Sequence, residues 1–208
     1  MNKTMLLTAV SALAMMASAF PAAAQETHFG GDRWQIRGRM IGVVPDESST
    51  VSAGGDLGIG NAVVPEVDIS YFFTENIAAE LIAATSQHSI KHSALGDLGD
   101  AWALPPTLTL QYHFTPNNAF SPDIGAGVNY TVMYGEDEAA GINKLEVDNG
   151  FGWALQAGAD YWINNNWGVN LDVKKIWVSM DASVNSGAIT ADVDLDPWVI
   201  GAGVSYRF

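Results

Sequence analysis

The dominant pattern of this chain is an alternation of apolar and polar residues. From Trp198 to Phe208 every second residue is apolar, and the residues between them are mostly small or polar. Residues 107–114 alternate in the same way, with apolar side chains at the even positions. Successive side chains of a strand point to opposite sides. The pattern therefore predicts β-strands that have one apolar face and one small, polar face.

The same period of two recurs along the chain. It is regular in five segments and less regular in three, and together they are residues 34–40, 63–73, 77–85, 107–114, 123–132, 151–161, 167–175 and 198–208. No segment shows a convincing helical period over its length. We therefore expect an all-β fold with eight strands.

The predicted connections alternate between long and short. The long ones are rich in Gly, Ser, Asp and Asn and cover residues 45–61, 86–104, 135–149 and 180–191. The short turns are residues 74–76, 115–119 and 164–166. Short periplasmic turns and long outer loops are typical of outer-membrane barrels. The connections predict an antiparallel up-and-down barrel of eight strands, with both termini on the side of the short turns.

The first residues do not look like part of this barrel. Lys3 supplies a positive charge, Met5 to Ala17 is almost entirely apolar, and Ala22-Ala23-Ala24 provides small residues before Gln25. This order is typical of a secretory signal peptide. A membrane-spanning helix is the alternative, but it needs roughly 20 apolar residues. We expect residues 1–24 to be a cleaved signal peptide and residues 25–208 to form the barrel.

Composition narrows the function classes. Without Lys3, the formal net charge changes from −14 to −15, and such an acidic chain repels nucleic acid. The chain has no cysteine, which excludes disulfides, thiol catalysis and cysteine-based metal sites. No apolar stretch after residue 24 is long enough for a spanning helix. If the chain enters a membrane, it must do so through its strands.

The polar faces contain charges of both signs. A soluble lipocalin-like barrel would turn these faces to water and its apolar faces inward. Charges of both signs instead suit a narrow lumen, where each buried charge must be paired. Aromatic residues also gather at the strand ends, as in the girdles of outer-membrane barrels. We therefore predict a transmembrane barrel whose lumen is closed by a polar plug: Arg37, Arg39, Glu66, Asp68, Glu80, Asp123, Asp160, Asp172 and Arg207, with Lys174 on the same kind of face.

The last strand ends in Tyr206-Arg207-Phe208. A terminal Phe that closes an alternating strand is similar to the outer-membrane assembly signal. We expect the protein to reside in the bacterial outer membrane, surrounded by its lipids. We also expect the barrel assembly machinery to recognise the strand that ends at Phe208.

The long predicted loops contain apolar residues. Exposed apolar patches often mark binding surfaces. These residues could form an apolar funnel that collects hydrophobic solutes, or they could pack on each other or lie among the lipid headgroups. They are Leu57, Ile59, Leu95, Leu98, Trp102 and Leu104.

Several blocks in order along the chain resemble the OmpW family and its AlkL-type relatives. They are Thr74 to Leu81, Leu104 to Tyr112, Gly125 to Thr131, Asp196 to Gly201 and the closing Tyr206-Arg207-Phe208. The resemblance implies an eight-stranded outer-membrane barrel that lets small hydrophobic molecules pass and releases them sideways through its wall. It also implies a constriction formed by an aliphatic side chain and a tryptophan. The matching positions are Ile82, which keeps the pattern, and Lys174, which does not.

Other candidate sites have plainer interpretations. Gly125 and Gly127, like Gly201 and Gly203, precede no helix, so they indicate close packing and not nucleotide binding. His88 and His92 lie at a predicted strand-to-loop junction, and we interpret them as solvated loop residues. We therefore expect no metal site and no cofactor.

Three acidic residues near the outer rim leave one question open. Asp192, Asp194 and Asp196 share a strand face and could hold Ca²⁺, but they could equally be a solvated rim. The sequence does not decide between these interpretations.

A catalytic function has little support. Ser86 could act with His88 or His113, but nothing in the sequence places these residues together. We expect no enzyme. The leading hypothesis is a narrow passive channel for small hydrophobic molecules, and the alternative is a closed structural or receptor barrel without transport.

Overall fold

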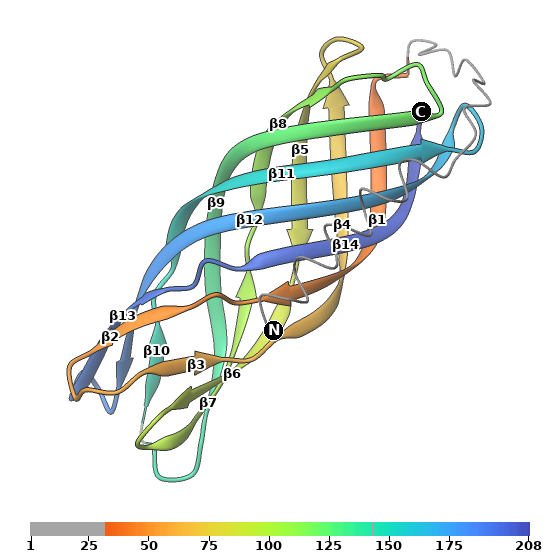
Figure 1. Ribbon diagram of the computed structural model, residues 1–208. Helices are drawn as coiled ribbons and strands as arrows, with labels where there is room; N and C mark the ends of the chain where they lie inside the picture. Colours follow the sequence, from red (N-terminus) through yellow and green to blue (C-terminus); the bar gives the residue numbers. More distant parts are fainter. Residues whose placement is uncertain (1–31, 143) are drawn as a thin grey trace, which may run out of the picture.

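The computed structural model describes residues 32–142 and 144–208 (Figure 1). The predicted signal peptide, residues 1–24, lies outside the described residues. The strands are β1 (Trp34–Val44), β2 (Ser48–Val51), β3 (Leu57–Ile59), β4 (Ala62–Phe72), β5 (Ile77–Ala84), β6 (Ser86–His92), β7 (Gly96–Leu104), β8 (Thr107–His113), β9 (Phe120–Glu138), β10 (Leu145–Val147), β11 (Gly150–Trp162), β12 (Trp167–Val184), β13 (Ile189–Asp194) and β14 (Trp198–Arg207). Within the described part of the chain, no helix is long and apolar enough to cross a membrane.

Eight of these strands close into a barrel. The hydrogen-bonded order is β1-β4-β5-β8-β9-β11-β12-β14, and β14 pairs with β1 again. Every pair is antiparallel. Apart from the closing pair of β14 and β1, each pair joins barrel strands that follow one another along the chain. The eight strands predicted from the alternating pattern are therefore confirmed.

The four long connections contain regular structure that the sequence did not indicate. They contain six strands, β2, β3, β6, β7, β10 and β13, and these extend the wall at the end opposite the C-terminus (Figure 1). The long strands β9 and β12 project beyond the other barrel strands and supply the ladders on which β7, β10 and β13 form. Some of their partners are distant in sequence, as for Val51 and Ala191, and a local pattern does not reveal such pairs.

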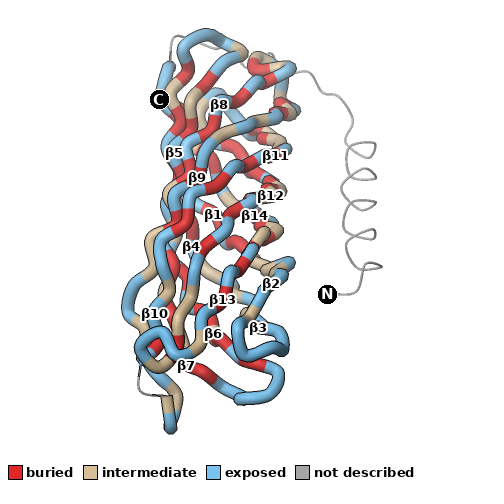
Figure 2. The backbone as a smooth tube through the Cα atoms, turned by 90° about the vertical axis from the view of Figure 1, so that its left-hand side faces the viewer, coloured by how far each residue is buried: buried red, intermediate tan, exposed pale blue. Residues whose placement is uncertain are grey.

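The barrel is built with its polar faces inside. On β8, Thr107, Thr109, Gln111 and His113 are buried, whereas the residues between them are exposed. Figure 2 shows the same alternation of buried and exposed positions along the other barrel strands. This arrangement exposes apolar side chains all around the outside, which requires an apolar surrounding. It excludes the soluble barrel that the sequence left as an alternative.

Aromatic residues form contacts at the end of the barrel that carries the short turns. Trp34 packs on Tyr71 with ring centroids 4.8 Å apart, and Trp167 packs on Tyr206 at 4.7 Å. The ring of Phe208 stacks on Tyr206 at 5.8 Å, and the Phe208 backbone exchanges hydrogen bonds with Trp34. The ring contacts form an aromatic girdle at this rim, as predicted, and the backbone hydrogen bonds join the end of β14 to the start of β1.

Glycines on the inner face allow neighbouring strands to approach. A Cβ atom on Gly127 would collide with the backbone carbonyl of Leu108 on β8, and one on Gly203 would collide with the carbonyl of Gly38 on β1. Both glycines lie within strands and precede no helix. Their role as packing residues, predicted in preference to nucleotide binding, is confirmed.

Candidate functional site

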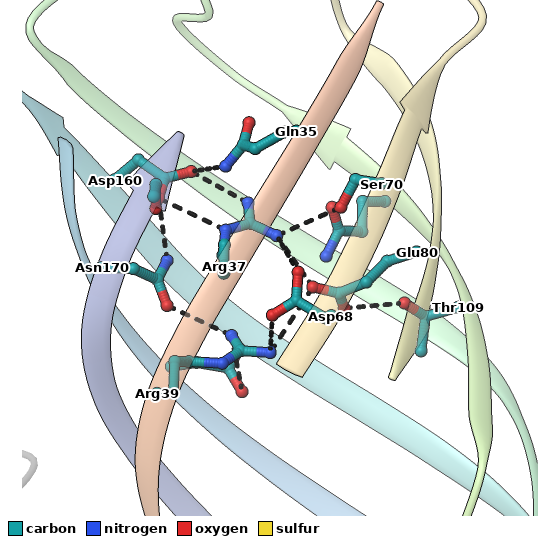
Figure 3. Close-up of polar contacts among 12 residues, drawn as sticks. Gln35, Arg37, Arg39, Asp68, Ser70, Glu80, Thr109, Asp160 and Asn170 are labelled. Carbon is teal, nitrogen blue, oxygen red and sulfur yellow. Dashed lines mark hydrogen bonds and ion pairs between the residues drawn. The ribbon is translucent and has the colours of Figure 1, made fainter. Parts of the chain in front are cut away.

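A network of buried charges, centred on two arginines of β1, closes the lumen (Figure 3). The Arg37 guanidinium donates to Glu80 at 2.8 Å, to Asp68 at 3.3 Å and to Asp160 at 2.9 Å. It thereby connects β1 with β4, β5 and β11. Because all four side chains are almost fully buried, their charges must compensate one another.

Arg39 forms a second centre one step along β1. Its guanidinium donates to Glu66 at 2.8 Å and contacts Asp68 at 2.6 Å. It also donates to the side-chain oxygen of Asn170 at 3.1 Å and lies 3.7 Å from Asp172. The two arginines alternate with outward-facing residues on β1, so the period of two places both of them in the lumen.

The remaining charged residues of the predicted plug are also buried in the lumen. Arg207 donates to Gln35 at 3.2 Å, and its guanidinium lies over the Trp162 ring, 4.3 Å from the centroid. Asp123 is 3 % exposed and lies on β9 near the short-turn end. The structure thus places all nine predicted plug residues inside the barrel.

An apolar cavity lies on the outer side of this plug. Its volume is about 50 Å³, and charged residues at its inner end are Glu66 and Lys174. Its apolar wall includes Ile41, Val43, Val64, Ile82, Ala84, Ile176, Val178, Leu195 and Val199. Ile82 and Lys174, the two positions matched to the family constriction, therefore line one cavity. Lys174 is 2 % exposed and donates to Asp172 at 3.2 Å.

The apolar residues of the predicted funnel separate into two groups. Leu57 and Leu98 are buried and, with Leu95, line a second, smaller pocket in the outer part of the lumen. Leu57 and Leu98 also belong to a cluster of buried apolar side chains, and Ile59 packs against this cluster.

Trp102 and Leu104 instead lie on the outer face of β7. Alternation along β7 turns Ala101 and Ala103 inward, so Trp102 points outward and stacks on Tyr134 with centroids 6.3 Å apart. These two residues therefore do not contribute to an internal funnel.

The interpretation of His88 and His92 as solvated loop residues was wrong. Both lie on β6 and are buried, because β6 pairs with β3 and β7 and turns them inward. The Nε2 of His92 contacts the Gly54 carbonyl at 2.9 Å, and its Nδ1 accepts from two backbone amides. Both ring nitrogens of each residue thus have protein partners.

Ser86 and His88 come together, which the sequence could not establish. The Ser86 hydroxyl lies 2.8 Å from Nε2 of His88, and Nδ1 of His88 lies 2.7 Å from the Gly60 carbonyl. The imidazole is oriented by a backbone carbonyl where a catalytic triad would have a carboxylate. Both side chains line the cavity, so they add a polar spot to its largely apolar wall.

The acidic residues of the outer rim are spread over two environments. Asp192 and Asp194 are exposed on β13, where Asp192 faces Asp181 of β12. This neighbouring carboxyl group raises the pKa of Asp181, because the two groups share a hydrogen bond and repel each other when both are charged. Asp196 instead accepts a hydrogen bond from the Val178 amide at 3.1 Å. Calcium binding by these residues stays an open prediction.

The closed antiparallel ring, its apolar outside and its plugged lumen define a membrane-spanning β-barrel of the outer-membrane class. The family model described as "OmpW family" matches residues 31–208. This chain belongs to the OmpW family and is an outer-membrane protein of a Gram-negative bacterium.

Individual relatives agree with this assignment. The chain is 48 % identical over 182 residues to the outer-membrane protein y4mB of Sinorhizobium fredii, a match that covers 84 % of this chain and 80 % of the relative. It is 33 % identical to outer membrane protein W of Vibrio cholerae, covering 96 % and 97 %. Among solved structures, OprG from Pseudomonas aeruginosa superposes with a TM-score of 0.81 at 31 % identity, covering 85 % of this chain and 96 % of OprG. The recognition of the family from sequence blocks is confirmed.

Proposed function

We propose that this barrel is a narrow passive channel for small hydrophobic molecules, which leave sideways into the membrane. The observation that carries the proposal is the apolar cavity that ends on Glu66 and Lys174. A solute that reaches this depth meets the Arg37–Arg39 network next, and an apolar molecule cannot cross such charges without a large desolvation cost. The cavity therefore favours an exit through the wall.

The outer lumen offers an apolar approach to this cavity. Buried side chains from β3, β6, β7 and β13 form one continuous hydrophobic cluster with those of the cavity wall, including Leu57, Ile90, Leu98 and Val193. Such a lining solvates hydrophobic molecules and gives no binding partner to ions. We assign the funnel to this cluster, which contains Leu57 and Leu98 and has Ile59 packed against it, and to the adjoining pocket that Leu95 lines.

The wall beside the cavity supports the sideways route. The ladder between β5 and β8 ends at Ile82 and Thr107, and the ladder between β6 and β7 starts only at Ser86 and Ala103. Between them lies Pro105-Pro106, whose nitrogens cannot donate hydrogen bonds. This interruption is a weak seam in the wall, and Ala84, Ser86, Ala103 and Pro105 line the cavity next to it.

We propose that Ile82 and Lys174 form the inner limit of the route. Ile82 narrows the apolar part, whereas Lys174 marks the start of the charged plug. In this scheme Lys174 replaces the tryptophan that the family resemblance implies, and it ends the path with a charge where an aromatic ring would narrow it.

Uptake of a small hydrophobic solute into proteoliposomes tests the channel. Ile82→Trp fills the cavity, so uptake should fall to the level of empty liposomes. Leu81→Trp is the matched control, since this neighbour is 49 % exposed on the outer face and should keep normal uptake. Equal uptake by empty liposomes and wild-type proteoliposomes would rule out the channel.

A closed structural barrel is the second candidate, and the size of the cavity favours it. Ligand sites for drug-sized molecules usually measure about 300–1,000 Å³, whereas this cavity measures about 50 Å³. Transport would thus require the apolar side chains of the outer lumen to move apart. If wild-type protein, Ile82→Trp and empty liposomes all give the same uptake, the closed barrel is the better description.

We also propose that the barrel assembly machinery recognises the β14 strand through Phe208. Support comes from the aromatic rim, where Phe208 and Tyr206 stack and the Phe208 backbone pairs with Trp34. Phe208→Ala should slow assembly in vivo while leaving refolding in detergent nearly unchanged. An unchanged assembly rate would contradict this role.

A further inference from the structure

Three metal-ligating side chains meet inside the barrel near its short-turn end. His113 on β8, Asp123 on β9 and Asp160 on β11 each offer a ligand atom, and these atoms lie within 4.8 Å of one another. The strands are neighbours, with His113 directly opposite Asp123 in the β8–β9 register. The sequence placed all three on polar faces but gave no sign that they converge.

Two of these side chains carry polar atoms without a partner. Within the described residues, neither Nδ1 of His113 nor Oδ2 of Asp123 has a hydrogen-bond partner. His113 is 0 % and Asp123 3 % exposed, so neither atom can turn to bulk water. An unsatisfied buried polar group is costly, and its presence in a native structure points to a missing ion, water or proton.

The histidine is arranged as a ligand. Its Nε2 lies 3.1 Å from the amide oxygen of Gln111, which accepts only when Nε2 carries the proton. Nδ1 is then left with a free lone pair. Histidine ligands commonly donate their second ring N–H to an oxygen acceptor in this way, which orients the ring and increases its basicity.

The charge balance of the lumen also calls for a cation. The buried carboxylates are Glu66, Asp68, Glu80, Asp123, Asp160 and Asp172, and the buried cations are Arg37, Arg39, Lys174 and Arg207. Six carboxyl groups thus face four cationic groups, a formal excess of two negative charges in the described lumen when every carboxyl group is ionised. One divalent cation would balance them.

We propose that His113, Asp123 and Asp160 bind one divalent transition-metal ion, which pins β8, β9 and β11 together at the inner end of the lumen. One imidazole nitrogen with carboxylate oxygens is a donor set that suits Zn²⁺. His113 and Asp123 are the primary ligands. Asp160 joins them by giving up its longest hydrogen bond, the 3.4 Å contact to Nε of Arg37.

Ser121 completes the site. Its hydroxyl is fully buried, has no hydrogen-bond partner within the described residues, and lies on β9 opposite Asp160. It can hold a water molecule in the open coordination position of the metal. This site lies at the short-turn end of the charged plug and shares no residue with the apolar cavity of the proposed transport route, so it does not depend on transport.

Metal content after refolding tests the proposal. The full chain is refolded in detergent with a slight excess of Zn²⁺ and desalted. Elemental mass spectrometry then measures the amount of zinc bound per protein. Wild-type protein should retain one equivalent of zinc, and zinc should raise its melting temperature. Asp123→Asn and His113→Gln should retain at least tenfold less, and Gln111→Ala should lower the affinity about tenfold.

His92→Gln is the matched control, since it removes a buried histidine from the other end of the barrel and should retain zinc fully. The folded state of each variant is checked by its electrophoretic mobility before heating. If a ligand variant fails to fold, the wild-type measurement alone decides. Wild-type protein without zinc, or variants that retain as much as wild type, would overturn the site, and the free carboxyl group of Asp123 would then carry a proton.

Discussion

Arg37 binds both carboxylate oxygens of Asp160, with Nη2 2.9 Å from Oδ2 and Nε 3.4 Å from Oδ1. Because β12 and β14 separate β1 from β11 on the shorter way around the ring, this pair bridges the lumen. Asp160 also accepts hydrogen bonds from Gln35, Asn170 and Ser205. The pair therefore links inward-facing residues of four strands and closes the lumen by side chains alone.

Removal of Arg37 should destabilise the barrel strongly. Arg37→Met leaves Asp160, Asp68 and Glu80 without their shared cation, and loss of one partner of a buried ion pair costs about 3–5 kcal/mol. Urea unfolding of the protein in lipid bilayers, followed by tryptophan fluorescence, measures this loss. Arg33→Met is the control, since Arg33 is exposed and its guanidinium donates to the backbone carbonyl of Phe73, and it should change the free energy of unfolding by less than about 1 kcal/mol. Similar losses for both variants would contradict the role assigned to the plug.

The contact of Gly127 with β8 gives a second prediction. In Gly127→Ala the new methyl group meets the Leu108 carbonyl, so the β8–β9 pair must shift. We expect a loss of about 1–3 kcal/mol in the free energy of unfolding, as for other overpacked positions. Gly38→Ala is the control, because a Cβ atom there meets nothing within 4 Å. A Gly127→Ala variant as stable as Gly38→Ala would show that β8 and β9 do not require this close approach.

The period of two predicted the eight barrel strands because each has one face in lipid and one face in the polar lumen. Residues 107–113 show this plainly, since every apolar side chain faces outward and every polar one inward. The outer strands lack this contrast. In β6, His88 and His92 lie inside while Lys91 lies outside, so both faces contain polar residues and the alternation disappears.

The contents of the plug were predictable, but its connections were not. Alternation places Arg37 and Asp160 on inner faces, yet which charges meet depends on the stagger of strands across the ring. The contact between Ser86 and His88 was also not predictable. These two residues face the same side because residues 86–92 form the strand β6, where the sequence indicated a loop. The meeting of His113 and Asp123 was not predictable either, since it depends on the β8–β9 register.

The outer β12–β13 ladder should respond to pH. Asp192 raises the pKa of Asp181, so the folded protein holds this proton more tightly than the unfolded chain does. The ladder is then most stable below the ordinary pKa of an aspartate, and it weakens as the pH rises through the raised value. NMR titration should find the Asp181 pKa above its ordinary value, and amide exchange in β13 should become faster, beyond the intrinsic pH effect, over the same range. Asp192→Asn should lower the pKa of Asp181 toward normal, and a pKa as high as in wild type would rule out the pairing as its main cause.

Lys174 allows the sideways exit to be distinguished from passage straight through the barrel. Lys174→Met keeps most of the side-chain length and removes the charge at the inner end of the cavity. If solutes leave through the seam at Pro105-Pro106, they never pass Lys174, so uptake of a neutral hydrophobic solute should stay within about twofold of wild type, a difference of less than about 0.5 kcal/mol. Stability should still fall, because Asp172 loses the nearer of its two cationic partners, at 3.2 Å, and keeps only Arg39 at 3.7 Å. Initial uptake rates into proteoliposomes that contain equal amounts of folded protein provide the measurement, and Ile82→Trp serves as the blocked reference. A tenfold change in uptake by Lys174→Met would mean that the solute passes this residue, and the exit would then have to lie deeper than the seam.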